Sequence, residues 1–591
     1  MKKLSIAALA GVLVASCSGG HGSSLIPSAP SVRTETAVPN GWAATATRGV
    51  KPVRGDDAGE FASAATRSAH TIARSIPVRV GLALRNVPQL QAAIASHQIV
   101  SRGEFLARYA PTSTNAEAVA SYLRSQGVRK VAVTPDRLLV AGEGQPEQLE
   151  PAFHTSIHAF SGANGPEYAN VKPALVPERF SGIVSGVLGL NSTAKLAFTP
   201  SPCFPTNPAP SGTPCLRDFG PQEMQTFYHV ANTPAASQTT VAIMAEGNVS
   251  QAVADLRYAE QQNGLPQVPA SIVQVGMASS DTSGLDEWDL DSQASTGLAG
   301  TVKHLYFYAT TSLTDSDVAN EYDRWVTDDK AQLGNSSFGE CEYSANLDGA
   351  MAVDDEILME AAAQGQTMFA STGDNGSACP VVAANGAPAS GLPMVNYPAS
   401  SPYVVGVGGT TLASNNDDTY LGELAWNAGG GGLSQFENSP KYMQKVQIVG
   451  GSAAEANLRG LPDIAMAADP NSGGFNVYTV QPLQTATGPC GEPCAVGGTS
   501  ESSPLAMGAY ARMQTAHHNA LGFAGVRLYD IYIANSSASS TPTGPPPTQT
   551  VDGYHDVITG SNGAYAALPG FDYTTGMGTL DIALTNQFIG Q

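Results

Sequence analysis

Positive charge is scarce in this sequence. Its 591 residues include 29 Lys and Arg against 50 Asp and Glu, which gives a formal net charge of −21 at pH 7. A nucleic-acid-binding protein needs a basic surface to meet phosphates, so this balance argues against that class. Charged residues of both signs make up only 13% of the chain. Few charges limit the self-repulsion that unfolds proteins in acid, so the composition is compatible with a protein that works at low pH.

Long hydrophobic runs are also absent. The N-terminal run Leu4 to Val14 follows two lysines and is too short to span a bilayer. It ends at Val14-Ala15-Ser16-Cys17, which resembles the lipobox of bacterial lipoproteins. We therefore predict a signal peptide over residues 1–16 and a membrane contact made only through a lipid anchor at Cys17. The alternative is an ordinary cleaved signal, which would release the protein outside the cell.

Cysteines are few, and their number suits disulfides. Removing a lipidated Cys17 leaves six, an even number that fits an oxidising compartment. Six cysteines allow 15 connectivities. A metal site at Cys490 and Cys494 is disfavoured, because no histidine or further cysteine clusters beside them. Proximity along the chain favours the pairs Cys203–Cys215, Cys341–Cys379 and Cys490–Cys494.

Shifts in composition divide the rest of the chain into four regions. Residues 17–74 are rich in Ser, Ala, Thr and Gly without apolar periodicity, which predicts a flexible tether. Residues 75–190 predict a compact domain with strands at 77–84, 130–133 and 137–141 and a helix at 116–126. Residues 191–222 are rich in proline and predict an exposed, protease-sensitive linker. Residues 223–591 form the largest region.

This largest region alternates strand-like and helix-like runs. Alternation of this kind predicts an α/β fold with a doubly wound, mostly parallel sheet and helices on both faces. Catalytic groups are then expected at the carboxyl ends of the strands. The predicted strands lie at 240–244, 272–275, 304–308, 367–370 and 403–407, and the predicted helices at 250–263, 286–299, 316–331 and 351–364.

The sharpest local signal is Gly497-Gly498-Thr499-Ser500, which leads into a helix predicted over 505–517. This arrangement places the Ser500 hydroxyl at a helix N-terminus, where backbone N–H groups and the helix dipole favour developing negative charge. Ser500 is therefore a candidate nucleophile. The alternative is simple N-capping, which any Ser or Thr before a helix can provide.

A histidine base for this serine is missing. Only five of the ten histidines follow the linker, and none of those precedes a glycine, as the subtilisin histidine does. His154 and His158 are spaced like metal ligands, but they lie in the smaller domain without further ligands, and we interpret them as structural. A Ser-His-Asp triad is therefore not expected.

Carboxylates can replace histidine in acid. Imidazole is almost fully protonated at about pH 4, whereas a Glu with a pKa of about 4.3 can still accept a proton. Glu287 and Asp291 are four residues apart and share one face of a predicted helix. Asp374 follows a predicted strand, where open α/β sheets hold catalytic groups. Helix-dipole and Asx-turn roles are the alternatives for these acids.

Together these motifs resemble the sedolisin family of serine-carboxyl peptidases. The resemblance implies a subtilisin-like peptidase domain, preceded by a smaller ferredoxin-like α+β activation domain. It assigns Ser500 as nucleophile, Glu287 as general base and acid, Asp291 as its orienting partner, and protonated Asp374 as the oxyanion-hole donor. Glu501 departs from the small residue usual at its position, which affects subsite preference more than chemistry. Further likeness lies in 335–339, the substrate-strand segment, where Phe338 supplies the expected aromatic, and in 105–109, 149–154 and 184–190 of the activation domain.

The C-terminal region resembles the calcium loop of this family. Calcium takes six to eight oxygen ligands, which mix carboxylates and backbone carbonyls. The resemblance implies one ion held by the side chains of Asp556 and Asp572. Carbonyls of Val557, Leu568 and Gly570 would complete the site, with Leu568 standing where the family usually has glycine.

The sequence as a whole predicts an exported, acid-active serine-carboxyl endopeptidase that acts on proteins and peptides. It is expected to be a monomer and a self-processing zymogen, inhibited by its own activation domain. We expect ion pairs from Arg102, Arg108, Arg124 and Lys130 to hold that domain against the acidic peptidase domain. The alternative is a surface-anchored, non-catalytic binding protein that keeps the fold. Because all four catalytic residues are present, the enzyme is favoured.

Overall fold

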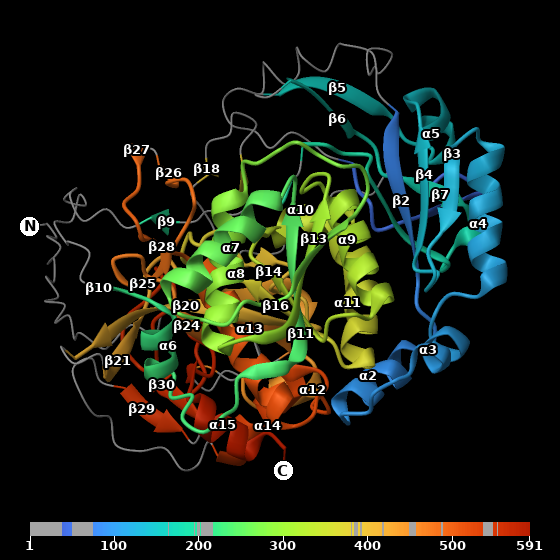
Figure 1. The fold of residues 1–591 in the computed structure, drawn as a ribbon. Coiled ribbons are helices and arrows are strands. Elements are labelled where there is room, and N and C mark those ends of the chain that lie inside the picture. Colours follow the sequence, from blue (N-terminus) through green and yellow to red (C-terminus); the bar gives the residue numbers. More distant parts are fainter. Residues whose placement is uncertain are drawn as a thin grey trace, which may run out of the picture.

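The computed structural model places both predicted domains and part of the linker between them (Figure 1). It describes residues 38–49, 75–162, 165–193, 195–197, 201–202, 217–379, 381–382, 388–389, 393–415, 419–447, 449, 457–485, 488–535, 548–551 and 553–590. The predicted signal peptide, Cys17 and the Cys203–Cys215 pair lie outside these residues. Among the helices that are described, none has an apolar stretch long enough to cross a membrane.

The activation domain contains a four-stranded antiparallel sheet in the order β3-β4-β2-β8, with helices between the strands. This order and the βαββαβ succession are ferredoxin-like, as predicted. Alternate residues of β2 (Ile76, Val78, Val80, Leu82) are buried in the domain's own core, because successive side chains point to opposite faces of a strand. The elements are β2 (Ile76–Leu82), α2 (Val87–Ala95), α3 (Arg102–Arg108), α4 (Ser113–Ser125), β3 (Arg129–Val133), β4 (Leu139–Gly144), α5 (Pro146–Ala152), β5 (Ile157–Gly162), β6 (Gly165–Asn170), β7 (Leu175–Pro177) and β8 (Val184–Leu188).

Part of the predicted tether belongs to this domain. Strand β1 (Trp42–Ala44) pairs antiparallel with β7. The Trp42 ring packs on His154, with 4.8 Å between the ring centroids. Thr47 is 1% exposed and donates a hydrogen bond to the Val187 carbonyl (2.9 Å). The expectation of a flexible tether is therefore wrong for residues 38–49, which are held by contacts that composition does not report.

The peptidase domain is built on an eleven-stranded sheet. The order β12-β13-β11-β14-β16-β20-β24-β31 is parallel throughout, and β30, β29 and β21 add antiparallel strands. This confirms the predicted, mostly parallel sheet. The strands are β11 (Ala236–Glu246), β12 (Ala270–Gln274), β13 (Val302–Thr310), β14 (Leu333–Ser336), β16 (Thr367–Ser371), β20 (Val404–Ser414), β21 (Tyr420–Ala425), β24 (Ile464–Ala467), β29 (Thr548–Val551), β30 (Tyr554–Val557) and β31 (Thr579–Leu580).

Helices form two groups beside this sheet. Helix α13 packs against α8 and over the central strands, and α8 also contacts α7. Helices α9 and α11 pack on each other and contact the activation domain, which lies beside them on the right in Figure 1. The helices are α6 (Pro221–Phe227), α7 (Ser250–Gln262), α8 (Leu285–Ala299), α9 (Asp315–Asp328), α10 (Glu342–Asp348), α11 (Ala350–Gln364), α12 (Lys441–Gln444), α13 (Thr499–Ala516), α14 (Ala524–Asn535) and α15 (Ile582–Phe588).

Smaller strand pairs and two disulfides complete the domain. The disulfides Cys341–Cys379 and Cys490–Cys494 are both present, as predicted. The remaining strands are β9 (Ser201–Pro202), β10 (Arg217–Phe219), β15 (Glu340–Cys341), β17 (Val381–Val382), β18 (Pro388–Ala389), β19 (Asn396–Tyr397), β22 (Gly432–Asn438), β23 (Leu458–Leu461), β25 (Ser472–Val477), β26 (Gln484–Thr485), β27 (Gly488–Pro489) and β28 (Cys494–Gly497).

Candidate active site

The predicted nucleophile lies inside a helix rather than before one. Helix α13 begins at Thr499, six residues earlier than predicted, so Ser500 is in its first turn and is 3% exposed. The preceding Gly498 has a φ of +113°, and a Cβ there would lie 2.5 Å from Asp374 Oδ2. Glycine is therefore required at this turn, because any side chain would push Asp374 away from Ser500.

The predicted acid pair lies on α8, directly beside α13. The two helices approach so closely that a Cβ at Gly508 of α13 would lie 2.5 Å from the carbonyl oxygen of Ser295 on α8. This close packing brings Glu287 and Asp291 to the first turn of α13. Both carboxyls are fully buried. The structure therefore brings the nucleophile and both acids together, as the sequence predicted.

Burial dominates the electrostatics of this pair. It raises the pKa of Glu287 and of Asp291 well above their usual values, and the Asp291 charge raises that of Glu287 further. The nearby Ser500 hydroxyl lowers the pKa of Glu287. Neither carboxylate oxygen of Glu287 has a hydrogen-bond partner, and the Ser500 hydroxyl donates to the Ser337 carbonyl instead (3.4 Å). Two such neighbouring carboxyls cannot both ionise in acid, and the pair keeps a proton available for transfer.

Asp374 follows β16 and completes the group. Its Oδ1 accepts hydrogen bonds from the backbone N–H of Thr499 (2.7 Å) and from the Thr499 hydroxyl (2.9 Å). Although the side chain keeps some solvent exposure, desolvation outweighs these bonds and raises the pKa of Asp374 to about 6. Below that pH the carboxyl is neutral and can donate a hydrogen bond.

A polar network that the sequence analysis missed supports Asp291. Ser503 donates to Asn335 Oδ1 (2.6 Å), and Asn335 donates to the Ser337 hydroxyl (3.0 Å). Ser337 in turn donates to Asp291 Oδ1 (2.6 Å). Ser337 and Asn335 both lower the pKa of Asp291. From the sequence, the segment 335–339 was predicted only as a substrate strand. The one sequence feature that could have indicated the network was Ser503, a serine three residues after Ser500.

Two residues singled out in the sequence are buried away from the cleft. Phe338 is fully buried and packs edge-to-face on Trp288, with 6.2 Å between ring centroids. Glu501 is also fully buried, and the nearby Asp469 charge adds to the rise in its pKa caused by burial. Glu501 therefore does not reach the surface that a substrate would meet.

The linker passes on both sides of the nucleophile. Ala197 and Gly339 exchange two backbone hydrogen bonds (2.8 and 3.1 Å), two residues beyond Ser337. The buried Leu196 donates its N–H to the Leu313 carbonyl (3.0 Å). Farther along, β9 pairs antiparallel with β28 at Gly497, three residues before Ser500. The described linker segments 195–197 and 201–202 thus pair with the chain on two sides of Ser500.

The C-terminal loop brings the two predicted calcium carboxylates together. Asp556 and Asp572 are 1% and 0% exposed, and the Asp572 charge adds to the rise that burial causes in the pKa of Asp556. Asp556 Oδ2 accepts from Gly570 N–H (2.8 Å), and an oxygen of Asp572 accepts from Leu568 N–H (2.9 Å). Asp556 Oδ1 is buried without a partner. Two buried acids with an orphaned oxygen fit a calcium ion, and the exposed side chain of Leu568 does not obstruct its backbone.

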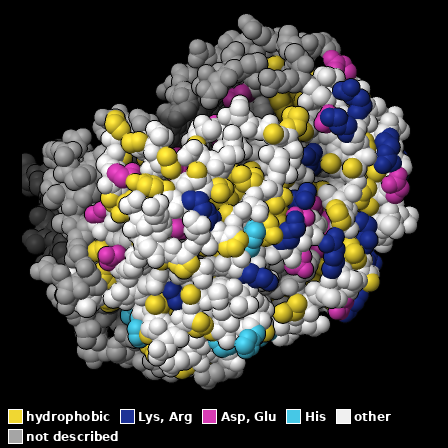
Figure 2. Space-filling model, viewed as in Figure 1, with side chains coloured by type: hydrophobic (Ala, Val, Ile, Leu, Met, Phe, Trp, Pro, Cys, Tyr) yellow, Lys and Arg dark blue, Asp and Glu magenta, His cyan; other side chains and the backbone are white. Residues whose placement is uncertain are grey.

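The expected docking ion pairs are wrong. Arg102 alone of the four basic residues crosses the interface, where it donates to the Thr327 carbonyl (2.5 Å). The other three pair within the activation domain, as Arg108–Glu104, Arg124–Glu117 and Lys130–Glu143. Figure 2 shows Lys and Arg gathered over that domain. Their partners are local because opposite charges lie within reach on the same helix, or on the neighbouring strands β3 and β4.

The interface instead buries carboxyls. Asp136 of the activation domain lies against Asp323 of α9 and Glu360 of α11. Burial raises the pKa of Asp323 and of Glu360 well above normal, and Asp136 raises both further. Glu356 accepts a hydrogen bond from Leu84 N–H (2.9 Å). Such contacts are favoured when the carboxyls are protonated, so acid does not loosen this interface in the way we expected.

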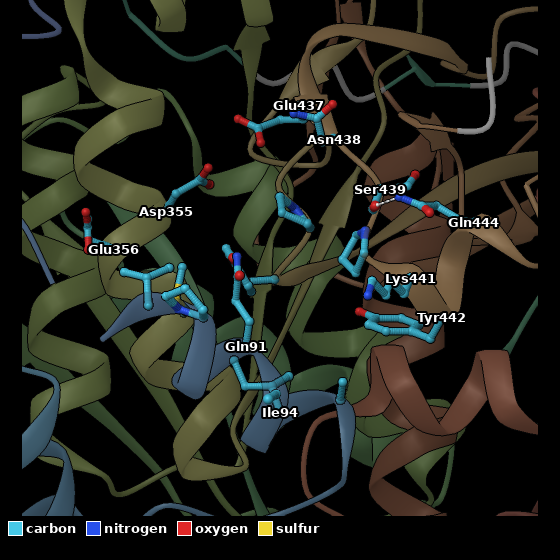
Figure 3. Close-up of a pocket in the computed structure, with 18 of the residues that line it drawn as sticks. Gln91, Ile94, Asp355, Glu356, Glu437, Asn438, Ser439, Lys441, Tyr442 and Gln444 are labelled. Atoms are coloured by element: carbon cyan, nitrogen blue, oxygen red, sulfur yellow. Dashed lines mark hydrogen bonds between the residues drawn. The ribbon is translucent and has the colours of Figure 1, made fainter. Parts of the chain in front are cut away.

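A cavity of about 790 Å³ lies in the same interface (Figure 3). Gln91 and Ile94 of α2 form one side, and Asp355 and Glu356 of α11 form another. Gln91 donates to the Tyr403 hydroxyl (2.8 Å). No catalytic residue lines this cavity, so it belongs to the seam between the domains and not to the substrate cleft.

The chain is similar to known proteins over most of its length. The model of the pro-kumamolisin activation domain matches residues 64–193, and that of the subtilase family matches residues 270–544. Sedolisin from Pseudomonas sp. (strain 101) is 35% identical over 544 residues, covering 86% of each chain. Xanthomonalisin from Xanthomonas sp. (strain T-22) is 34% identical over 86% of this chain and 65% of its own. A structure of Pseudomonas sedolisin, a serine-carboxyl proteinase complexed with pseudo-iodotyrostatin, aligns with a TM-score of 0.55 over 63% of this chain and 98% of that one.

Proposed function

The chain belongs to the sedolisin family of serine-carboxyl peptidases, and from this premise we propose that Ser500, Glu287, Asp291 and Asp374 hydrolyse peptide bonds in acid. A serine peptidase with an activation domain is a zymogen, and the binding-protein alternative is not favoured. The observation that carries the proposal is the convergence of one serine and three raised-pKa carboxyls around the first turn of α13.

The first chemical step transfers a proton within this group. Ser500 Oγ attacks the substrate carbonyl carbon while its proton passes to Glu287, which Asp291 holds in place. The carbonyl π electrons move to oxygen, and protonated Asp374 donates a hydrogen bond to that oxyanion. Collapse of the intermediate breaks the C–N bond, and Glu287 gives its proton to the departing amine. Water then releases the acyl group from Ser500, with Glu287 again acting as base.

Acid dependence follows from these roles. Asp374 must be neutral to donate, and its pKa of about 6 makes it neutral below that pH. Above pH 6 an ionised Asp374 would repel the oxyanion. Asp374 therefore sets the upper pH limit of activity. The carboxyls buried between the domains do not set it, because protonation does not weaken their contacts.

Self-processing is supported by the position of the linker. Its backbone pairs with Gly339 on one side of the site and with Gly497 on the other. The scissile bond is expected between Ala197 and Pro202. To test this, the full precursor is shifted from pH 7 to pH 4 and its new N-terminus is sequenced, with Ser500→Ala as the control. A new terminus in 198–202 that is absent from the control supports the proposal, and an intact wild-type chain contradicts it.

Calcium and export complete the proposal. Asp556 and Asp572 would hold one calcium ion with carbonyls of Val557, Leu568 and Gly570, and the ion would neutralise two buried acids and so stabilise the loop. Export with a lipid at Cys17 rests on the N-terminal sequence. Cys17→Ser should release the protein from membranes into the soluble fraction, and unchanged membrane association would contradict the anchor.

A further inference from the structure

A second group of buried carboxyls lies outside the catalytic site and outside the C-terminal loop. Asp315 begins α9, Glu340 begins β15 and Asp348 ends α10. One carboxylate oxygen from each of the three lies within 4.8 Å of the other two. The side chains are 4%, 9% and 5% exposed. Three acids from three separate elements therefore converge on one point in the interior.

Asp354 of α11 is an independent fourth member of this group. It is 2% exposed, and its Oδ1 has no hydrogen-bond partner. Its charge raises the pKa of both Asp315 and Glu340, which places it against the cluster. Asp315 Oδ1 and Glu340 Oε1 are likewise buried without partners. Asp315, Glu340 and their neighbour Asp354 thus each carry one orphaned oxygen, whereas buried carboxylates are ordinarily hydrogen-bonded or paired.

No basic side chain among the described residues is paired with this group. The charges that act on Asp315, Glu340, Asp348 and Asp354 are all carboxylates. One backbone donor, Ala350 N–H, reaches Asp348 Oδ1 at 3.2 Å. Asp291 of the active site, by contrast, accepts a hydrogen bond from the Ser337 hydroxyl (2.6 Å). A buried cluster of this size needs bound protons or a cation to balance its charge, and its orphaned oxygens favour a cation.

We propose that Asp315, Glu340, Asp348 and Asp354 bind a divalent cation of the calcium class. The donors are oxygens only, which excludes soft metals and favours hard cations. Burial leaves little room for the waters that magnesium retains, whereas calcium accepts several carboxylates in flexible geometry. This inference does not depend on the proposed catalytic roles or on the C-terminal loop.

The site also lies beside both ends of the activation domain. Leu313, two residues before Asp315, accepts from Leu196 N–H, and Gly339, just before Glu340, pairs with Ala197. The carbonyl of Leu347, just before Asp348, accepts from Arg48 N–H (2.7 Å). A cation here would hold in place the segments around Leu313, Gly339 and Leu347, which contact the linker and the segment after β1.

Counting bound calcium in the full precursor tests the site. Ser500→Ala prevents self-cleavage, and Asp572→Asn in that background removes the ion expected in the C-terminal loop. Both variants are equilibrated with calcium at pH 6.5, desalted and analysed for metal content. We expect two ions per chain for Ser500→Ala and one for the double variant. Adding Glu340→Gln and Asp354→Asn should remove the last ion, or weaken its affinity at least tenfold.

Asp317→Asn is the matched control, because Asp317 lies on α9 two residues after Asp315 and outside the cluster. It should leave the last ion bound. If the Glu340 and Asp354 changes prevent folding, terbium titration of the Ser500→Ala/Asp572→Asn precursor replaces them, and a luminescence signal excited through the tyrosines and displaced by calcium supports the site. No ion in the folded Ser500→Ala/Asp572→Asn variant would overturn it, because protons would then balance the cluster. One ion in Ser500→Ala that disappears with Asp572→Asn would confirm the loop and refute this site.

Discussion

The two domains differ sharply in charge. Residues 75–190 contain ten Lys and Arg and eight Asp and Glu, whereas residues 223–591 contain nine and 37. In the activation domain three of the eight acids form ion pairs with basic side chains, as in Lys130–Glu143. In the peptidase domain many are buried, including Glu287, Asp315 and Glu360. The difference teaches that pH acts chiefly on the peptidase domain and its buried faces, while the activation domain is close to charge balance.

Removing the nucleophile or its base should have the largest effect. Ser500→Ala and Glu287→Gln should each lower kcat/KM on a protein substrate at pH 4 by at least about 10³-fold, because the serine is inert without a proton acceptor. Near-UV circular dichroism serves as the folding control. Activity within tenfold of the wild type in either variant would remove these residues from the mechanism.

Asp374→Asn should have the next largest effect and should sharpen the role of pH. An amide donates weakly compared with a neutral carboxyl, so kcat should fall by about 10²-fold. Asparagine cannot ionise, however, and the decline in activity that Asp374 causes near pH 6 should disappear from the residual pH profile. If activity of the variant still declines near pH 6 as in the wild type, a group other than Asp374 causes that decline.

Calcium removal should destabilise the peptidase domain and leave the activation domain largely unaffected. At pH 6.5 a chelator should lower the Tm of the Ser500→Ala precursor by several degrees, because the ion binds the native loop in preference to the unfolded chain. Asp572→Asn should already have the lower Tm and should respond less to the chelator. An identical Tm with and without chelator in both proteins would contradict calcium binding.

Stability should fall as pH rises. Glu342 is fully buried and accepts from Ser434 Oγ (2.6 Å), yet burial raises its pKa to about 7. Its folded pKa exceeds its unfolded value, so its stabilisation is complete below about pH 4 and is lost as pH rises through 7. One such group contributes at most about 3 kcal/mol. Urea unfolding of Ser500→Ala with and without Glu342→Gln, from pH 5 to 8, should show a shallower decline in the glutamine variant. Parallel curves would contradict this assignment.

An exposed ion pair of the activation domain should have the smallest effect. Arg124→Ala breaks the contact with Glu117 at the surface of α4, where solvent screens both charges. The Tm of the Ser500→Ala precursor should change by no more than the error of measurement, at pH 4 and at pH 7. A clear loss of stability would mean that surface charge matters more in this domain than its exposure suggests.

Much of the fold could be read from the sequence, because its elements are long and strongly periodic. The helix predicted at 351–364 is α11 (Ala350–Gln364), and the strand predicted at 367–370 is β16. The serine and the acid pair to which we assign catalysis could also be proposed from the sequence, since each belongs to a short local motif. The start of α13 was missed by six residues, because the Thr-Ser-Glu-Ser-Ser-Pro run reads as a turn and packing against α8 makes it helical.

By itself, then, the sequence determined the periodic elements, two disulfides and the residues of the catalytic motifs, because these depend on neighbours within a few positions. The tertiary structure decided which acids share a proton or require a counter-charge. Ser503, Asn335 and Ser337 meet Asp291 only when α13, β14 and α8 come together. Asp136 meets Glu360 only when the domains dock. Desolvation and long-range contact, which set these pKa values, exist only in the folded chain.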